Sequence, residues 1–270
     1  MSRIQKTFRD LKKKGQAALI PFLMAGDPDL KTTADLILKM AEAGADIIEL
    51  GAPYSDPLAD GPTIQAAAHR VWQRGINLKS VLNLSGHLKG KTPPLVIMTY
   101  FNPVFRFGLK AFAENCRECG VEGVIIPDLP PEEAGPWIKE ARKTGIDTIF
   151  LTAPTSSPER ISLASKVSRG FIYHVSVTGV TGVRGKLSAD LELAVRKIRE
   201  ISKKPVSVGF GISTPAQARE VSRFADGIIV GSAIVKIIKD GGERKEVIQR
   251  VGAFISSLAA ATGAKLQKLE

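Results

Sequence analysis

The chain has 270 residues, of which 44% are hydrophobic, so it can bury a substantial core. Lys and Arg outnumber Asp and Glu by 38 to 27, but they do not gather in the stripe expected of a nucleic-acid binding protein. No run reaches the roughly 18 apolar residues of a membrane helix, and the N-terminus lacks a signal-peptide core, so we expect a soluble cytoplasmic protein without nucleic-acid or membrane partners.

The first predicted element is an amphipathic helix over residues 3–14, with Ile4, Phe8 and Leu11 on one face and basic residues on the other. Eight short apolar runs follow, typical of strands buried on both faces: 17–24, 46–50, 95–99, 121–126, 147–151, 170–175, 205–209 and 226–230. Helical stretches separate them: 29–43, 63–74, 109–119, 132–144, 158–167, 189–201, 215–222 and 243–259.

This alternation predicts an α/β fold, a (β/α)8 TIM barrel that forms one domain over residues 1–270. We expect helix 3–14 to cross the N-terminal end of the barrel, and residues 78–90 to form an inserted helix after helix 2. An open doubly wound sheet is the structural alternative.

The cysteines and histidines do not indicate a metal site. Cys116 and Cys119 form a single Cys-x-x-Cys, and we interpret them as small apolar fillers one turn apart near a helix end. The three histidines are scattered, and period-two alternation turns His174 away from Tyr173, toward the surrounding helices. We therefore expect neither a metal nor a cofactor.

Two acidic residues mark the candidate catalytic site. Glu49 ends a buried strand on the face that also carries Ile47, and a carboxylate there is costly unless it is used. Asp60 follows at the end of a loop restricted by Pro53 and Pro57. Taken singly, Glu49 could form a structural ion pair and Asp60 a turn or helix cap. Together they favour catalysis.

Glycines after the last strands indicate a phosphate site. Gly211 follows strand 205–209, and Gly231 and Ser232 follow strand 226–230 at the start of a helical turn. Glycines let backbone amides approach an anion, and a helix N-terminus adds unpaired donors. Together with Gly182 in the preceding loop, they match the recurrent phosphate site of barrels; the alternative for each is an ordinary turn.

Residues 49–65, Glu-Leu-Gly-Ala-Pro-Tyr-Ser-Asp-Pro-Leu-Ala-Asp-Gly-Pro-Thr-Ile-Gln, resemble the signature of the tryptophan synthase α subunit family. The resemblance covers essentially the whole chain, through Tyr-Phe-Asn-Pro (100–103), Pro-Asp-Leu-Pro (127–130), Gly-Val-Thr-Gly (179–182), Gly-Phe-Gly-Ile-Ser (209–213) and Gly-Ser-Ala-Ile-Val (231–235). It implies a lyase of tryptophan biosynthesis that cleaves indole-3-glycerol phosphate into indole and glyceraldehyde 3-phosphate. It also implies that indole passes to a β subunit in an α2β2 heterotetramer, and that no cofactor is needed.

The resemblance also implies roles for single residues. Glu49 would donate a proton to ring carbon three and then accept one from the glycerol hydroxyl, while Asp60 would remain ionised and bind the ring N–H. Gly182, Gly211, Gly231 and Ser232 lie where the family binds phosphate. An apolar pocket for the indole ring would draw on Phe22, Ile64, Tyr100 and Tyr173, although barrel-core filling is the alternative for each.

Residues 179–185 look like a closing loop in which Thr181 reaches an acid, and Val177 stands where some relatives carry arginine. Three other functions stay open: a freestanding lyase, a barrel isomerase or epimerase acting on another sugar phosphate, and a noncatalytic subunit that activates its partner. The isomerase would not need the proline loop between Glu49 and Asp60. The noncatalytic subunit would need neither acid.

Overall fold

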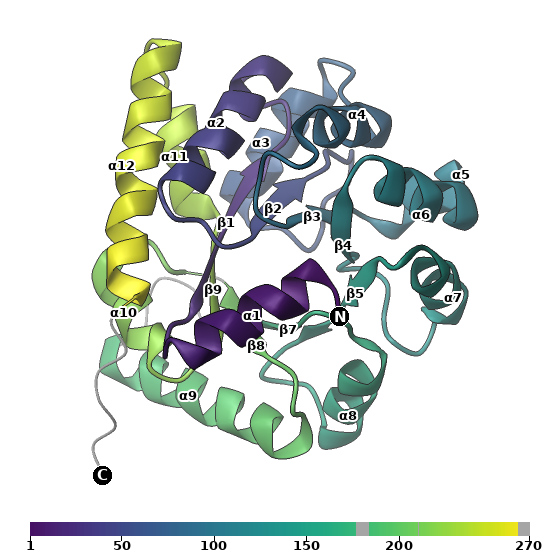
Figure 1. Ribbon diagram of the computed structural model, residues 1–270, viewed down its shortest axis with the longest axis vertical. Coiled ribbons are helices and arrows are strands. Elements are labelled where there is room, and N and C mark those ends of the chain that lie inside the picture. The colour runs from purple at the N-terminus through teal and green to yellow at the C-terminus, as the bar shows by residue number, and fades with distance from the viewer. Residues whose placement is uncertain (177–183, 210, 264–270) are drawn as a thin grey trace.

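The computed structural model describes residues 1–176, 184–209 and 211–263 (Figure 1). Within them, parallel strands form one sheet in the order β5-β4-β3-β2-β1-β9-β8-β7-β6. Their bounds are β1 Ala18–Met24, β2 Ile48–Gly51, β3 Leu95–Met98, β4 Val121–Ile125, β5 Asp147–Ile149, β6 Leu151–Thr152, β7 Ile172–Val175, β8 Val206–Gly209 and β9 Gly227–Val230.

The two edges of this sheet meet at Phe150, because β5 and β6 are the two parts of one predicted strand. β5 pairs with β4, and β6 pairs with β7. The backbone amide of Tyr173 also donates to the carbonyl of Phe150 at 3.1 Å. The sheet is therefore the predicted TIM barrel rather than an open doubly wound sheet.

Helices surround the strands (Figure 1). Their bounds are α1 Arg3–Lys13, α2 Leu30–Glu42, α3 Pro62–Trp72, α4 Leu78–Leu88, α5 Phe101–Phe107, α6 Leu109–Glu118, α7 Gly135–Thr144, α8 Pro158–Val167, α9 Arg184–Ile201, α10 Pro215–Ser222, α11 Ser232–Lys239 and α12 Arg244–Thr262. Among the described residues, we find no helix that combines the length and apolar character needed to cross a bilayer.

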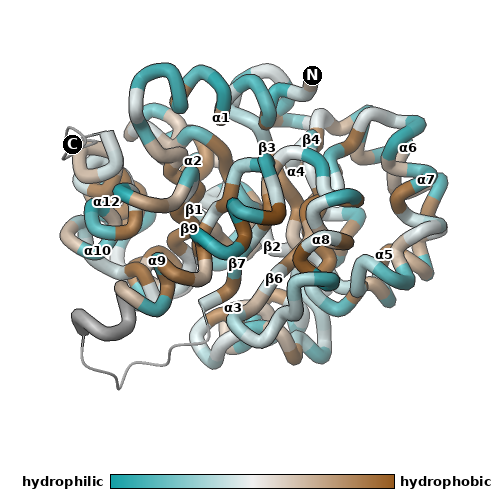
Figure 2. The backbone as a smooth tube through the Cα atoms, turned by 90° about the horizontal axis from the view of Figure 1, so that it is seen from below, coloured by the Kyte–Doolittle hydropathy of each residue, from teal (hydrophilic) through white to brown (hydrophobic). Residues whose placement is uncertain are grey.

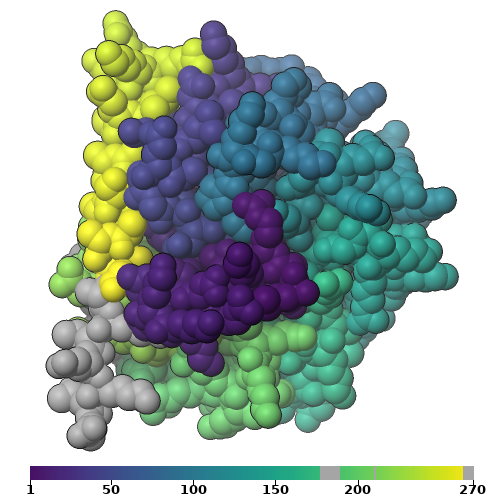
Figure 3. Space-filling model, viewed as in Figure 1, coloured from purple at the N-terminus to yellow at the C-terminus, as the bar shows by residue number. Residues whose placement is uncertain are grey.

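Helix α1 crosses one end of the barrel, as predicted, and lies in front of the strands in Figure 1; Figure 3 shows it in purple on the face turned to the viewer. Ser2 and Gln5 form a capping box that starts the helix. Ile4 and Phe8 are buried, and the ring centroid of Phe8 is 5.4 Å from that of Phe171 inside the barrel. This apolar contact closes the N-terminal end of the barrel.

Two helices connect β2 to β3, and they occupy different places. Helix α4 contacts α2 and α6, so it takes the lateral position in the ring of helices. Helix α3 contacts α11 and β1 instead, and Figure 2 shows it at the opposite end of the barrel from α1. Arg70 of α3 pairs with the buried Asp27 after β1 at 2.7 Å, which holds the helix over that end.

The cysteines and His174 lie as predicted. Cys116 is buried in the core between the barrel and its helices, and Cys119 packs against this core. Ring atom Nδ1 of His174 lies 3.1 Å from Oγ1 of Thr152, and burial lowers the pKa of His174 to about 4. Tyr173, the preceding residue, belongs to the separate cluster inside the barrel.

Candidate active site

Glu49 lies inside the barrel near the end that α3 covers. Its neighbours Ile48 and Leu50 join the core outside the barrel, so alternation along β2 turns Glu49 inward, level with Phe22 on β1. Only 1% of Glu49 is exposed, and Oε2 has no hydrogen-bond partner among the described residues. Burial, and to a smaller extent the charge of Asp60, raises the pKa of Glu49 to about 8. The group therefore holds a proton at neutral pH.

Asp60 stands just before α3, but it does not cap that helix. The N-cap position is Gly61, which has no side chain to bond to the free amides there. Burial raises the pKa of Asp60 to about 6, and a hydrogen bond from Tyr100 opposes the rise. Asp60 is therefore mostly ionised at neutral pH, while Glu49 is mostly neutral.

Tyr100 links Asp60 to the segment that follows β3. Its hydroxyl donates to Oδ2 of Asp60 at 3.2 Å and accepts from the backbone amide of Ala59 at 3.0 Å. Burial, followed by the charge of Asp60, raises the pKa of Tyr100, so the phenol remains a donor. The sequence predicted Tyr100 as an aromatic contact and did not predict its hydrogen bond to the acid.

Tyr173 lies close to both acids. The side chain belongs to the barrel interior, and burial, followed by the charges of Glu49 and Asp60, raises its pKa. A Cβ at Gly209, where β8 ends, would lie only 2.4 Å from the Tyr173 hydroxyl. The glycine thus makes room for the tyrosine between the acids and the end of β8.

Phe22 lies between two glycines. A Cβ at Gly51 would lie 2.6 Å from Cζ of Phe22, and a Cβ at Gly231 would lie 3.3 Å from its Cδ1. The Gly231 position is also 3.5 Å from Cδ1 of Ile64 on α3. The structure therefore brings two predicted ring contacts, Phe22 and Ile64, against Gly231 of the predicted phosphate site.

Of the other residues predicted to bind phosphate, the structure describes Ser232 and Gly211 but not Gly182. Ser232 is exposed and begins α11, whereas Gly211 is exposed with a φ of 80°, and no atom of the described residues, its chain neighbours aside, lies within 4 Å of where its Cβ would stand. Val177, Thr181 and Gly182 lie outside the described residues, as does most of the predicted loop 179–185. Arg184 and Gly185 begin helix α9 instead of continuing that loop.

Tyr54, Asn102 and Asp128 surround Tyr100, and sequence reasoning did not assign them to the site. The Tyr54 ring stacks on Tyr100 with centroids 5.2 Å apart. The Tyr54 hydroxyl accepts a 3.1 Å hydrogen bond from Nδ2 of Asn102, and Oδ1 of Asp128 accepts one from the amide of Phe101 at 2.8 Å. Asn102 and Asp128 do occur in the Tyr-Phe-Asn-Pro and Pro-Asp-Leu-Pro motifs, which is the only signal that could have drawn attention to them.

Comparison with known proteins gives one consistent result. The chain matches the family described as tryptophan synthase alpha chain over residues 8–263. Tryptophan synthase alpha chains of a Thermoanaerobacter species and of Prochlorococcus marinus are 47% and 49% identical to it, over 96% and 97% of this chain and 98% and 94% of theirs.

Solved structures agree. The crystal structure of tryptophan synthase subunit alpha from Legionella pneumophila is similar, with a TM-score of 0.90 and 37% identity over 97% of this chain and 98% of that one. A chain in a ligand-free tryptophan synthase structure from M. tuberculosis has a TM-score of 0.89 and 36% identity, over 98% of this chain and all (100%) of that one.

Proposed function

The chain belongs to the tryptophan synthase alpha chain family, and from that premise we propose how its residues cleave indole-3-glycerol phosphate to indole and glyceraldehyde 3-phosphate. As a family member it is a carbon-carbon lyase subunit. The assignment of roles depends above all on one observation: Glu49 is buried with a raised pKa near Asp60, and Tyr100 holds Asp60 by a hydrogen bond.

Cleavage begins with a proton on the indole ring. Expelling an aryl carbanion is prohibitive, so ring carbon three must be protonated before its bond to the glycerol chain breaks. We assign this proton to Glu49, whose raised pKa keeps the carboxyl neutral and able to donate. The product of this step is a positively charged indoleninium, with Glu49 left as a carboxylate.

The same carboxylate completes the reaction. As the carbon-carbon bond breaks, its electron pair returns to the ring to give neutral indole, and the adjacent glycerol hydroxyl becomes the aldehyde of glyceraldehyde 3-phosphate. Glu49 accepts the hydroxyl proton and regains its starting state. The step is balanced without an external oxidant or reductant.

Asp60 stabilises the positive charge. In this proposal its carboxylate accepts a hydrogen bond from the ring N–H, and the interaction strengthens as the ring becomes charged. Tyr173, which lies close to both acids, would contact the ring together with Phe22 and Ile64. These three aromatic and aliphatic side chains exclude water from the protonated carbon.

The phosphate group would bind at the start of α11. The backbone amides of Ile234 and Val235 donate to the carbonyl of Gly231, so the amides of Ser232 and Ala233 stand in the first turn, where a helix has no internal acceptor for them. We propose that Gly231 and Ser232, with Gly211 after β8, bind the phosphate dianion through backbone donors. Thr181 and Gly182 stay predictions of the sequence.

The β subunit is the proposed partner, in an α2β2 heterotetramer. Two apolar side chains on the same end as Asp60 are unusually exposed: Leu58 in the loop before α3, at 80%, and Phe105 on α5, at 66%. Asp56 and Pro57 adjoin Leu58, and the proline limits the loop's freedom before docking. This surface would receive the partner that accepts indole.

The direct test mixes the purified chain with indole-3-glycerol phosphate and follows indole, with and without a tryptophan synthase β subunit. We expect slow indole release from the chain alone and faster release with the partner. Glu49→Gln is the matched control, because the amide keeps the shape of the side chain but cannot relay a proton. Release that is unaffected by any β subunit would favour the freestanding lyase, and absence of indole would contradict the proposed reaction.

A further inference from the structure

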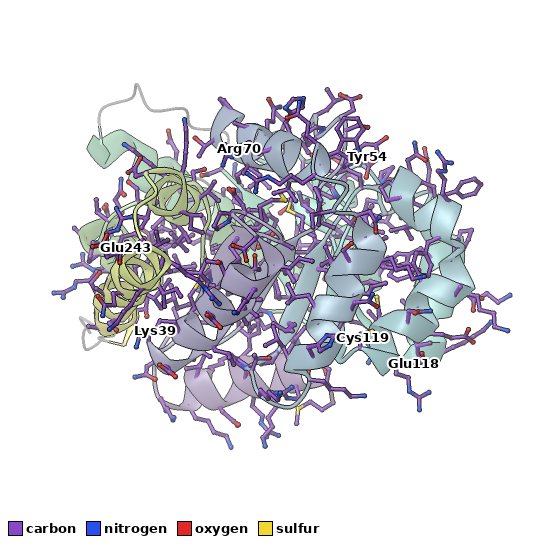
Figure 4. The ribbon with its side chains drawn as sticks, turned by 90° about the horizontal axis from the view of Figure 1, so that it is seen from above. Lys39, Tyr54, Arg70, Glu118, Cys119 and Glu243 are labelled. Atoms are coloured by element: carbon purple, nitrogen blue, oxygen red, sulfur yellow. The ribbon has the colours of Figure 1, made fainter. Side chains whose placement is uncertain are left out.

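We propose that Tyr54 is a positioning residue for the cleavage reaction: together with Asn102 it holds the Tyr100 hydroxyl against Asp60. This inference rests on the proposed function and extends it to residues outside the predicted site. Figure 4 labels Tyr54 and Arg70 at the end of the barrel opposite Lys39, which is the end that α3 covers.

The Tyr100 hydroxyl has only one arrangement that satisfies both of its contacts. The amide of Ala59 can only donate, so the phenol oxygen accepts from it at 3.0 Å. The phenol hydrogen is then directed to Oδ2 of Asp60, 3.2 Å away. One side chain thus binds the backbone and the carboxylate of two consecutive residues, and it leaves Oδ1 of Asp60 for the ring N–H.

Tyr54 restrains the Tyr100 ring itself. The two rings are stacked at 5.2 Å with planes 27° apart, and Tyr54 is in turn fixed by the hydrogen bond from Asn102 to its hydroxyl. Tyr54 belongs to the loop that carries Asp60, whereas Asn102 belongs to α5. The stack and the hydrogen bond therefore join the Asp60 loop to the first turn of α5, and we call this pair of contacts the Tyr54 latch.

A third loop holds the backbone directly after Tyr100. Asp128, in the segment between β4 and α7, accepts from the amide of Phe101, the first residue of α5. The backbone next to Tyr100 is therefore anchored independently of Tyr54. Loss of the latch should free the Tyr100 ring while leaving α5 in place, which separates a positioning effect from general unfolding.

Within the part of the chain that the structure describes, few ionisable groups act on Asp60. Glu49 comes from β2, Tyr173 from β7 and Tyr100 from the segment after β3, while Asp128 acts on Tyr100 from the segment after β4. Of these contacts, only the hydrogen bond from Tyr100 favours the ionised form of Asp60. Releasing Tyr100 should therefore raise the pKa of Asp60 and leave fewer molecules with the carboxylate that the reaction needs.

The experiment compares Tyr54→Ala, which removes the ring and hydroxyl, with Tyr54→Phe and Asn102→Ala, which each remove the same hydrogen bond from one side. We expect Tyr54→Ala to lower kcat about tenfold with little change in KM, since misplacing a catalytic group mainly affects the transition state. The two hydrogen-bond variants should have smaller and equal effects, and combining them should add nothing. Asn115→Ala, which removes an exposed asparagine bond within α6, is the control that should leave kcat unchanged.

A second measurement does not depend on activity. Carbon-13 titration of the Asp60 carboxyl, assigned by its loss in Asp60→Asn, should give a higher pKa in Tyr54→Ala than in the wild type. If Tyr54→Ala does not fold, Tyr54→Phe and Asn102→Ala provide the same comparison. An unchanged Asp60 titration and kcat in the folded variants would overturn the latch. Absence of cleavage by the wild type would instead overturn the proposed function and leave the titration to decide the latch.

Discussion

A change of pH should have opposite effects on activity through Glu49 and through Asp60. In the proposed mechanism Glu49 must be protonated, a state that is lost as pH rises through its pKa of about 8. Asp60 must be ionised, a state that is lost as pH falls through its pKa of about 6. For two independent groups with these values, the competent fraction is about 0.8 at pH 7 and about 0.1 at pH 5 or pH 9. The chain should therefore show a bell-shaped dependence of kcat/KM centred near neutrality, with a roughly ninefold fall on each side.

The assay is initial indole formation from indole-3-glycerol phosphate between pH 5 and pH 9, with kcat/KM reporting the free enzyme. The substrate phosphate also titrates near pH 6, so the acid side contains a contribution from the substrate. Asp60→Asn separates the two, because the phosphate contribution remains in the variant and the Asp60 contribution disappears. Measurements at saturating substrate reduce the phosphate effect further.

The same variant tests the alkaline side. The charge of Asp60 contributes to the raised pKa of Glu49, so removing it should move the alkaline limb to lower pH. Burial, the larger cause, remains, so the limb should stay well above the ordinary range of a glutamate. An alkaline limb that stays in place or moves upward in Asp60→Asn would refute the assignment of that limb to a Glu49 coupled to Asp60.

Glu49→Gln should lower turnover by about 10²–10⁴-fold while binding is kept, measured by indole release and calorimetry. Gly231→Val should remove the protection that inorganic phosphate gives the wild type in a thermal melt, because the side chain crowds the start of α11. Gly51→Ala should cost about 1–3 kcal/mol of stability by displacing Phe22, whereas Gly135→Ala, in open space, should not. The pKa of His174 is about 4 in the folded chain and 6.5 in the unfolded chain, so the unfolded chain binds more protons as pH falls. Lowering the pH from neutral to 5 should therefore reduce the free energy of unfolding of the wild type by about 2 kcal/mol more than that of His174→Gln, measured by denaturant unfolding.

The strands could be predicted because a parallel barrel buries both faces, and each strand is then a short apolar run between helices. The break at Phe150 could not, since Ile149, Phe150 and Leu151 form a continuous apolar stretch and the break depends on two different neighbouring strands. β5 pairs with β4 through Ile149, and β6 pairs with β7 from Leu151. A strand that changes its pairing partner along its length has no pattern in its own sequence that would reveal the change.

The inward position of Glu49 followed from period two alone, and its raised pKa followed from burial. The role of Tyr100 did not follow, because an aromatic residue after a strand fits a pocket wall equally well. Its partner Asp60 is distant in the chain, and the Tyr54 contacts depend on how two loops fold against each other. The spacing of residues in a strand determines which face of the sheet each side chain points to, but it does not determine which loops contact each other.

The break at Phe150 divides the barrel into two continuous segments, residues 1–149 with β1 to β5 and residues 151–263 with β6 to β9. Glu49 and Asp60 lie in the first segment, and the proposed phosphate residues Gly211 and Gly231 lie in the second. The substrate would therefore contact both segments: its indole ring and glycerol hydroxyl would meet the acids of the first, and its phosphate would bind to the second. Two fragments separated at this position should consequently complement each other in trans, and a phosphate ester that contacts both should act as a molecular bridge that tightens their association.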